Sequence, residues 1–136
     1  VYTVFASGEM TVDASFVPGA NLPDLPRFGL QMELPATFDH MQWLGRGAHE
    51  TYSDRKYGAI IGVYQQSVKN DFYHYVYPQE SSNKTDVSWL MLQNDTDNGL
   101  IISSDQLLSM SAWPYSQEAI DLATHVPELP APDRVT

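Results

Sequence analysis

Cysteine is absent from the 136-residue chain, and basic residues are few. The lack of cysteine excludes disulfides, thiolate nucleophiles and cysteine-based zinc sites. Seven Lys and Arg stand against 17 Asp and Glu, which gives a formal net charge of −10. Nucleic acids and anionic membrane surfaces bind clustered cations, so neither is an expected partner.

Long apolar runs and targeting signals are missing as well. No apolar segment approaches the roughly 20 residues that a membrane-spanning helix needs. The chain opens VYTVFAS, without a basic segment or an initiating Met, so no signal peptide is visible and the compartment stays open. It starts inside a strand-like run and ends in the Pro-rich ELPAPDRVT. We therefore expect residues 1–136 to be a single domain cut from a longer protein.

What the chain does contain is the pattern of a β protein. Apolar residues make up 43% of it and aromatic residues 12%, as in a globular domain. Apolar and polar residues alternate in short runs separated by turn signals, and one further run is apolar on both faces. The expected strands lie at residues 10–16, 28–34, 59–66, 72–77, 87–93, 100–103 and 107–112, and the expected turns at 18–26, 80–86 and 94–99. This pattern predicts an all-β fold, an antiparallel β-sandwich.

One helix is expected, at residues 116–124 (SQEAIDLAT). Ser116 is a good N-cap, and Glu118 suits the positive end of the helix dipole.

No motif indicates catalysis or metal binding. Glu50 and Asp54 flank Tyr52, but spacing alone cannot bring two carboxyl groups to the separation that a glycosidase needs. There is no G-x-S-x-G and no phosphate-binding loop. The four histidines are scattered at intervals that match no zinc motif: His40, His49, His74 and His125. We predict no catalytic residue, no metal ligand and no cofactor in this chain.

The stretch WLGRGAHETYSDRK, residues 43–56, interrupts the β pattern with glycines and charged groups. We expect its glycines to supply turn geometry. Asp54 and Arg55 are expected to pair with neighbours, and Arg46 and Arg55 to bind Glu50 or Glu80. These polar groups also lie near aromatic residues that can stack on sugar rings, although most aromatic side chains in β proteins are buried in the core. The candidate carbohydrate-binding residues are His49, Glu50, Asp54 and Arg55.

Several motifs in fixed order resemble one family. They are LPRFGLQMELP (25–35), WLGRGAHETYSDRK (43–56), YVYPQESSNKTDVSWL (75–90), SAWPYSQEAIDLATH (111–125) and ELPAPDR (128–134). Together they resemble the C-terminal β-sandwich of bacterial β-galactosidases of glycoside hydrolase family 2, a module that is the small subunit where the enzyme is split in two. The resemblance covers residues 22–134. Ala48 and Ser53 depart from it, since both positions are commonly Pro in the family, which predicts a less rigid loop here.

The resemblance implies a part of an enzyme rather than a whole one. It implies a retaining hydrolase of terminal β-galactosides that uses magnesium and often sodium. Both catalytic glutamates of the family lie in a (β/α)₈ barrel, and no position here matches them. This chain would be a structural and substrate-gating part of a galactose-mutarotase-like supersandwich, inactive alone. Its partners would be the remainder of an oligomeric enzyme and its galactoside substrate.

Two other interpretations stay open. In one, the chain is a stand-alone carbohydrate-binding module. In the other, it is a domain that only holds oligomer contacts. If the chain is instead part of a β-galactosidase, we expect the stretch at residues 43–56 to be a structural corner of the sandwich, near but not in the active site.

Overall fold

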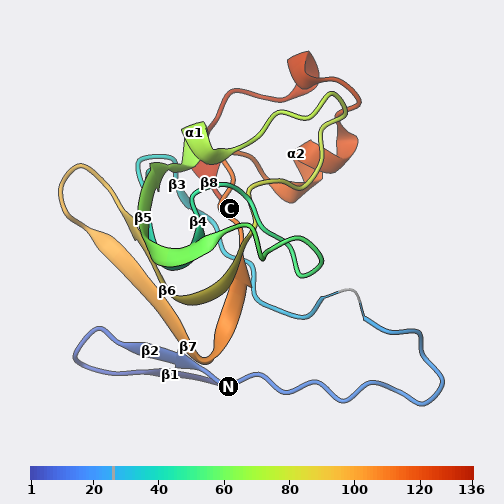
Figure 1. Ribbon diagram of the computed structural model, residues 1–136. Helices are drawn as coiled ribbons and strands as arrows, with labels where there is room; N and C mark the ends of the chain where they lie inside the picture. Colours follow the sequence, from blue (N-terminus) through green and yellow to red (C-terminus); the bar gives the residue numbers. More distant parts are fainter. Residues whose placement is uncertain (26) are drawn as a thin grey trace. The chain divides into compact units, whose positions relative to one another are not determined.

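The computed structural model describes residues 1–25 and 27–136 and shows an antiparallel all-β chain with short helices (Figure 1). The expected fold class, an all-β sandwich, is confirmed. The strands are β1 (Tyr2–Val4), β2 (Met10–Val12), β3 (Leu34–Pro35), β4 (His40–Gly47), β5 (Ile60–Ser67), β6 (Lys84–Gln93), β7 (Gly99–Met110) and β8 (Arg134–Val135). The helices are α1 (Val68–Asp71), α2 (Gln117–Leu122) and the 3₁₀ turn Val126–Glu128.

The chain forms two compact units, Val1–Leu30 and Gln31–Thr136. In the first unit β1 and β2 make an antiparallel hairpin. The rings of Phe16 and Phe28 stack there with centroids 5.5 Å apart. The expected strand at residues 10–16 is thus reduced to its first three residues, which are the ones that find a hydrogen-bonding partner.

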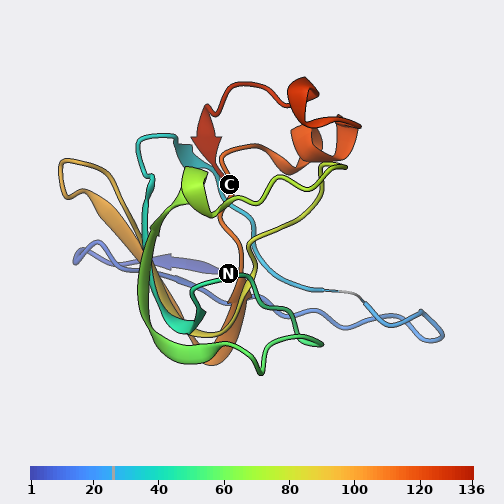
Figure 2. The same ribbon diagram turned by 45° about the horizontal axis from the view of Figure 1, so that its top comes forward.

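The second unit is built on a four-stranded sheet in the order β5-β4-β6-β7. All neighbouring strands in it are antiparallel. Helices α1 and α2 and the short strand β8 lie at one end of this sheet in both views (Figures 1 and 2). Strand β8, near the end of the chain, pairs antiparallel with β3.

Two hydrophobic clusters stabilise this unit. One face of the sheet packs the larger cluster, in which Trp43 is fully buried. The smaller cluster gathers aromatic residues around α2. The buried members of the larger cluster are Met41, Trp43, Val68, Val87, Leu90, Leu92, Ala112 and Val135, and those of the smaller cluster are Phe72, Trp113, Tyr115 and Ile120.

Strand β4 occupies half of the stretch that the sequence pattern set apart. Its alternate residues from Met41 to Gly47 are buried, as period-2 geometry requires. Two inward positions are glycines, so the apolar alternation disappears from the sequence after Trp43. A Cβ on Gly45 would lie 2.8 Å from a methyl of Val87, and one on Gly47 would lie 2.8 Å from the ring of Tyr64. The expectation of turn geometry is wrong for both glycines, because close packing is what requires them.

The aromatic run at residues 72–77 is not a strand, contrary to expectation. Ser67 caps α1 by accepting a hydrogen bond from the amide of Asn70 (3.4 Å), and Phe72 ends that helix. Phe72 then packs edge-on against Tyr115 with ring centroids 5.2 Å apart. The apolar content of this run therefore serves the second cluster and not a sheet.

Other expectations differ at the edges of the sheet. Strand β5 was expected to be buried on both faces, yet it is an edge strand with Ile60, Ile61 and Val63 exposed. Of residues 28–34 only Leu34 is in a strand, since β8 offers a partner of two residues. The runs at 100–103 and 107–112 join into the single strand β7. Helix α2 is confirmed, with Ser116 accepting from the amide of Ala119 at 3.1 Å.

Candidate functional site

The loop that follows β4 packs against residues 80–86, which form a buried polar segment rather than the expected turn. The Thr51 amide donates to the carbonyl of Asn83 (2.7 Å), and the Asn83 side-chain amide donates back to the carbonyl of Thr51 (2.8 Å). The Thr85 amide donates to the Thr51 hydroxyl (2.9 Å). Thr51 and Thr85 are buried, so these hydrogen bonds replace the water that their polar atoms lose.

Glu50 joins three segments of the chain. Its Oε1 accepts hydrogen bonds from the hydroxyl of Tyr75 and from Nη2 of Arg55 (3.3 Å). Its Oε2 accepts from the backbone amide of Ser82 at 2.8 Å. The hydrogen bond to Glu50 raises the pKa of Tyr75, because it is lost when the phenol ionises. We call Glu50, Arg55, Tyr75 and Ser82 the Glu50 network.

A small cavity opens beside the Glu50 network. Its volume is about 300 Å³, and the guanidinium of Arg55 lies 4.4 Å from the centroid of the Tyr52 ring. Burial, followed by the charges of Glu50 and Glu80, raises the pKa of Tyr52 to about 12. Tyr52 is therefore a neutral hydroxyl near pH 7. The cavity is lined by Tyr52, Arg55, Tyr75, Gln79 and Glu80.

The four candidate carbohydrate-binding residues do not all come together. Glu50 and Arg55 meet, whereas His49 and Asp54 are exposed. Within the described residues no side-chain hydrogen bond or ion pair links His49 or Asp54 to the Glu50 network. The expected pairing of Asp54 is therefore wrong, because its side chain points to solvent and Glu50 takes Arg55. A role of the four residues in sugar binding stays a prediction.

A second polar network holds the same loop to the start of β6. Asp86 accepts from Nε of Arg46 (2.6 Å) and from Nζ of Lys56 (2.8 Å). Nη1 of Arg46 also donates to the carbonyl of Ala59 at 2.8 Å. The expectation that Arg46 binds Glu50 or Glu80 is corrected: its carboxylate partner is Asp86 on the neighbouring strand β6.

Replacing Asp86 with asparagine should destabilise the chain only above acidic pH. Hydrogen bonds from Lys56 and then from Arg46 lower the pKa of Asp86 from its usual value of 3.8. The carboxylate therefore stabilises the folded state above pH 3.8, and this contribution is lost as the pH falls through the lowered pKa of the folded state. We expect Asp86→Asn to cost about 2 kcal/mol at pH 7, the usual scale for hydrogen bonds to a charged group.

Urea unfolding of both proteins between pH 7 and pH 2 measures this difference. The two curves of unfolding free energy should converge at the acidic end. A difference in unfolding free energy that stays constant from pH 7 to pH 2 would contradict this prediction, since it would show that the negative charge of Asp86 does not stabilise the fold.

A third ion pair, between Asp71 and Lys84, is more deeply buried than those of Glu50 and Asp86. Nζ of Lys84 donates to both carboxylate oxygens of Asp71, each at 2.9 Å, and it lies 5.2 Å from the Trp43 ring centroid. The Lys84 side chain is fully buried and that of Asp71 is 5% exposed. Burial raises the pKa of Asp71 although Lys84 acts in the opposite direction. The Ser82 hydroxyl donates to the backbone carbonyl of Asp71.

Sequence reasoning missed Asp71, Lys84 and Asp86 as members of these networks. Their signal is an alternation of polar residues in S-N-K-T-D, where the side chains of Lys84 and Asp86 replace apolar ones at the start of a strand. The Glu50 and Asp86 networks tie the loop after β4 to residues 82–86, and the Asp71–Lys84 pair ties the end of α1 to the same segment. Chemically, the arrangement stabilises a corner of the fold, and the cavity lined by Tyr52 and Tyr75 lies beside it.

The described residues were also searched for metal-ligand groups and for membrane-spanning helices. Among residues 1–25 and 27–136, no group of three or more His, Asp or Glu side chains is placed to hold a metal ion. In the same part of the chain no helix has the length and apolar character to span a membrane.

Comparison with known proteins identifies the family to which the chain belongs. The family described as "Beta galactosidase small chain" matches residues 1–136. A protein named Beta-galactosidase from Priestia megaterium is 39% identical over 99% of the chain. One from Halalkalibacterium halodurans is 32% identical over 95%, and Beta-galactosidase BgaC from Bifidobacterium adolescentis is 32% identical over 96%. The chain spans only 13% of the length of each of these relatives. By its match over the whole sequence, this chain belongs to the β-galactosidase small-chain family.

Proposed function

We propose that this chain is a non-catalytic module of a β-galactosidase of glycoside hydrolase family 2, located near the C-terminus of that enzyme or in its small subunit. The observation that carries the proposal is the family match from the first residue to the last, by a chain that spans 13% of relatives named β-galactosidase. In the assembled enzyme the reaction is the hydrolysis of terminal β-galactosides with retention. Both catalytic glutamates, magnesium and sodium belong to the remainder of the enzyme. The module borders the substrate entrance.

Exposed apolar strands support association with that remainder. Ile61 and Val63 on β5 are 55% and 60% exposed, and Ile101 on β7 is 68% exposed. The cross-strand register places Ile61 and Val63 on the same face of the sheet as Arg46 and Leu44. An open edge strand with exposed apolar side chains is a surface that other strands cover in a stable protein. We propose that the remainder of the enzyme covers it and completes a galactose-mutarotase-like supersandwich, in an oligomeric parent.

Complementation tests the proposal. The 136-residue chain alone should not hydrolyse a chromogenic β-galactoside, and addition of the remainder of the enzyme should restore turnover. A charged variant of the edge strand, Val63→Glu, should lower the restored activity by about tenfold or more, because an unpaired charge in an apolar contact costs several kcal/mol. Val76→Glu is the matched control, since Val76 is 93% exposed and lies outside both the strand and the networks.

Turnover by the chain alone at an ordinary rate would refute the non-catalytic assignment. Full restoration by Val63→Glu would show that β5 does not contact the remainder.

Carbohydrate binding by His49, Glu50, Asp54 and Arg55 is a second candidate function. The cavity beside the Tyr52 ring favours it, since that ring and the Arg55 guanidinium offer a stacking surface and hydrogen-bond donors to a sugar. If this site binds sugar, Arg55→Ala should abolish the binding. Titration of the chain with lactose, followed by the side-chain amide resonance of Gln79 at this cavity, measures the binding.

A further inference from the structure

An Asn-Gly pair lies where the loop between β6 and β7 ends. The loop consists of residues 94–98, and Gly99 is the first residue of β7. Residues 95–98 are exposed, and the loop projects beyond the sheet in both views (Figures 1 and 2). The three networks described above consist of other residues. The loop is therefore outside the candidate site and open to water.

The backbone of the hairpin leaves the Gly99 nitrogen free. The amide of Asp97 donates to the carbonyl of Asn94 at 3.2 Å, and Asp97 has a φ of 58°, so a tight turn is followed by a left-handed residue. The amide of Asn94 donates to the carbonyl of Asn98 at 3.0 Å. The next pair, Gln93 and Gly99, is then of the kind whose amides point away from the partner strand. Because β7 is an edge strand, the Gly99 nitrogen lies outside the hydrogen-bond ladder of the described sheet.

The two asparagines of this loop are held very differently. Oδ1 of Asn94 accepts hydrogen bonds from the Thr96 amide (3.0 Å), the Thr96 hydroxyl (2.9 Å) and the Asn98 amide (3.1 Å). Within the described residues, the Asn98 side chain bonds only to Oγ1 of Thr96 (2.9 Å), which belongs to the same exposed loop. The Asn94 side chain is thus fixed inside the turn, whereas that of Asn98 is tied to nothing outside the loop.

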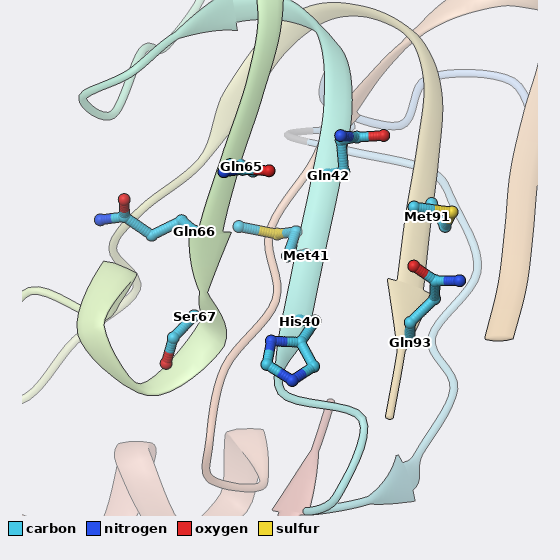
Figure 3. Close-up of a pocket in the computed structure, with 8 residues that line it drawn as sticks. All are labelled: His40, Met41, Gln42, Gln65, Gln66, Ser67, Met91 and Gln93. Atoms are coloured by element: carbon cyan, nitrogen blue, oxygen red, sulfur yellow. The ribbon is translucent and has the colours of Figure 1, made fainter. Parts of the chain in front are cut away.

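The beginning of the loop is also fastened to the sheet. His40 of β4 lies opposite Gln93, the last residue of β6 (Figure 3). Nε2 of His40 lies 2.6 Å from Oδ1 of Asp95. This contact holds the half of the loop that contains Asn94. It does not reach the half that contains Asn98.

Close packing explains why a glycine follows Asn98. A Cβ on Gly99 would lie 2.6 Å from Cγ of Gln93 and 3.0 Å from the carbonyl oxygen of Leu92. Glycine has no Cβ to shield its own nitrogen, and its backbone adopts conformations that other residues do not. The packing that requires Gly99 therefore places an unshielded backbone nitrogen directly after an exposed asparagine.

We propose that Asn98 is a site of spontaneous deamidation, and that its isoaspartyl product opens the β6–β7 ladder from the hairpin end. The Gly99 nitrogen, after losing its proton to water or hydroxide, attacks Cγ of Asn98. The new N–Cγ bond closes a cyclic imide, the Cγ–Nδ2 bond breaks, and Nδ2 leaves as ammonia. Water then opens the imide at either carbonyl and gives aspartate or isoaspartate. The reaction consumes water and releases ammonia, and the proposal does not depend on the assignment to β-galactosidase.

The two products affect the hairpin differently. In isoaspartate the main chain continues through Cγ, which adds an atom to the backbone between Asn98 and Gly99. The carbonyl that accepts from the Asn94 amide then becomes part of a free carboxylate. The pairing of Gln93 with Gly99 cannot keep its present register. Aspartate adds the same negative charge and leaves the backbone unchanged.

Mass spectrometry of the aged chain tests the site. The folded 136-residue chain is kept at neutral pH and body temperature, and its peptides are then analysed for aspartate and isoaspartate, with an isoaspartyl methyltransferase as the probe for isoaspartate. Asn98 should be converted ahead of Asn94 and of the other asparagines, which are Asn21, Asn70 and Asn83. Asn98→Gln is the matched control, because its longer side chain closes the imide far more slowly, and its methyl acceptance should fall to background. Conversion of Asn98 no faster than that of Asn94 would overturn the proposal.

Unfolding of the separated product tests the consequence. The isoaspartyl chain is compared with the variant Asn98→Asp, which carries the same charge on an unaltered backbone. The unfolding equilibrium constant of the isoaspartyl chain should be about tenfold larger, the effect of losing one or two backbone hydrogen bonds. Identical unfolding curves for the two proteins would refute the opening of the ladder.

The longer protein that contains this chain gives a second measurement of the site. Because the loop projects from the sheet, Asn98 should be converted ahead of Asn94 there as well. An unmodified Asn98 after several weeks would overturn the proposal. This readout needs no galactoside turnover, so its failure is distinct from a failure of the proposed function.

Discussion

Replacing Asp71 with alanine is expected to destabilise the chain by about 3–5 kcal/mol, the usual cost of leaving one charge of a buried pair without its partner. The Lys84 ammonium has no exposed surface, and both of its shortest contacts are to the Asp71 carboxylate at 2.9 Å. Without Asp71, Lys84 keeps only the Ser82 carbonyl at 3.2 Å and the Trp43 ring. Lys84 must then lose its proton or open the core to water. Urea unfolding at pH 7 measures the loss.

The control for Asp71→Ala is an exposed ion pair of similar geometry. Glu33 lies 3.0 Å from Arg134, with side chains that are 51% and 35% exposed, and Arg134 also contacts Asp133 at 2.8 Å. Glu33→Ala should change the unfolding free energy by only about 0–1 kcal/mol, because water solvates the remaining charge. Adding Lys84→Met to Asp71→Ala should recover much of the loss, since the uncompensated charge is then removed as well. If Asp71→Ala costs no more than Glu33→Ala, the buried pair does not stabilise this corner.

Replacing Glu50 with alanine should lower the unfolding free energy by about 3 kcal/mol, the upper end of the usual cost of leaving a buried hydrogen-bonding group without its partner. The Glu50 side chain is 21% exposed, and it accepts the Ser82 amide hydrogen bond at 2.8 Å. Its loss leaves that amide without a partner in a buried position and releases the Tyr75 hydroxyl. The exposed contact to Arg55 adds little. Thermal unfolding followed by circular dichroism measures the effect, and the titration of Tyr75 should move back toward that of a free phenol.

Asp54→Ala is the matched control for Glu50→Ala. The two carboxylates are four residues apart in the same loop, yet only Glu50 is bound to other segments. Asp54→Ala should change stability by about 0.5 kcal/mol or less, as surface substitutions do. Equal losses for the two variants would mean that the loop tolerates neither change for a reason other than the Glu50 network. If either variant instead abolished turnover of the assembled enzyme at unchanged stability, the loop would belong to the active site.

The three networks share one short segment. The Ser82 amide binds Glu50, Lys84 binds Asp71, and Asp86 binds Arg46 and Lys56. Alternate residues of one chain segment therefore fasten the loop after β4, the end of α1 and the start of β6. Hydrogen bonds to charged groups are stronger than neutral ones, which suits a corner with few apolar side chains.

How much of this was predictable differs from element to element. Helix α2 was predictable because its signals are local: the Ser116 cap and the following apolar spacing lie within nine residues. Strand β5 was predictable from its β-branched residues, but its position at the edge of the sheet was not, because burial depends on which strands pair. Strand β4 was hidden by Gly45 and Gly47, whose reason for being glycine is the nearness of Val87 and Tyr64.

The candidate site follows the same division. The sequence indicated that residues 43–56 are a polar corner, and its motifs pointed to the family that the comparison confirms. It could not indicate that Asp54 faces solvent while Asp86 binds Arg46, since carboxylates 32 residues apart are equivalent until the chain folds.

By itself, the sequence determined the properties that depend on composition and near neighbours. These are the absence of disulfides, the acidic surface, the β alternation, the capped helix and the family motifs. Tertiary structure alone decided which charges are buried together, as for Asp71 and Lys84, and which carboxylate faces water, as for Asp54. The physical reason is that strand register and burial are long-range properties: they fix the partner of each polar group and hence whether its charge stabilises the fold or faces water.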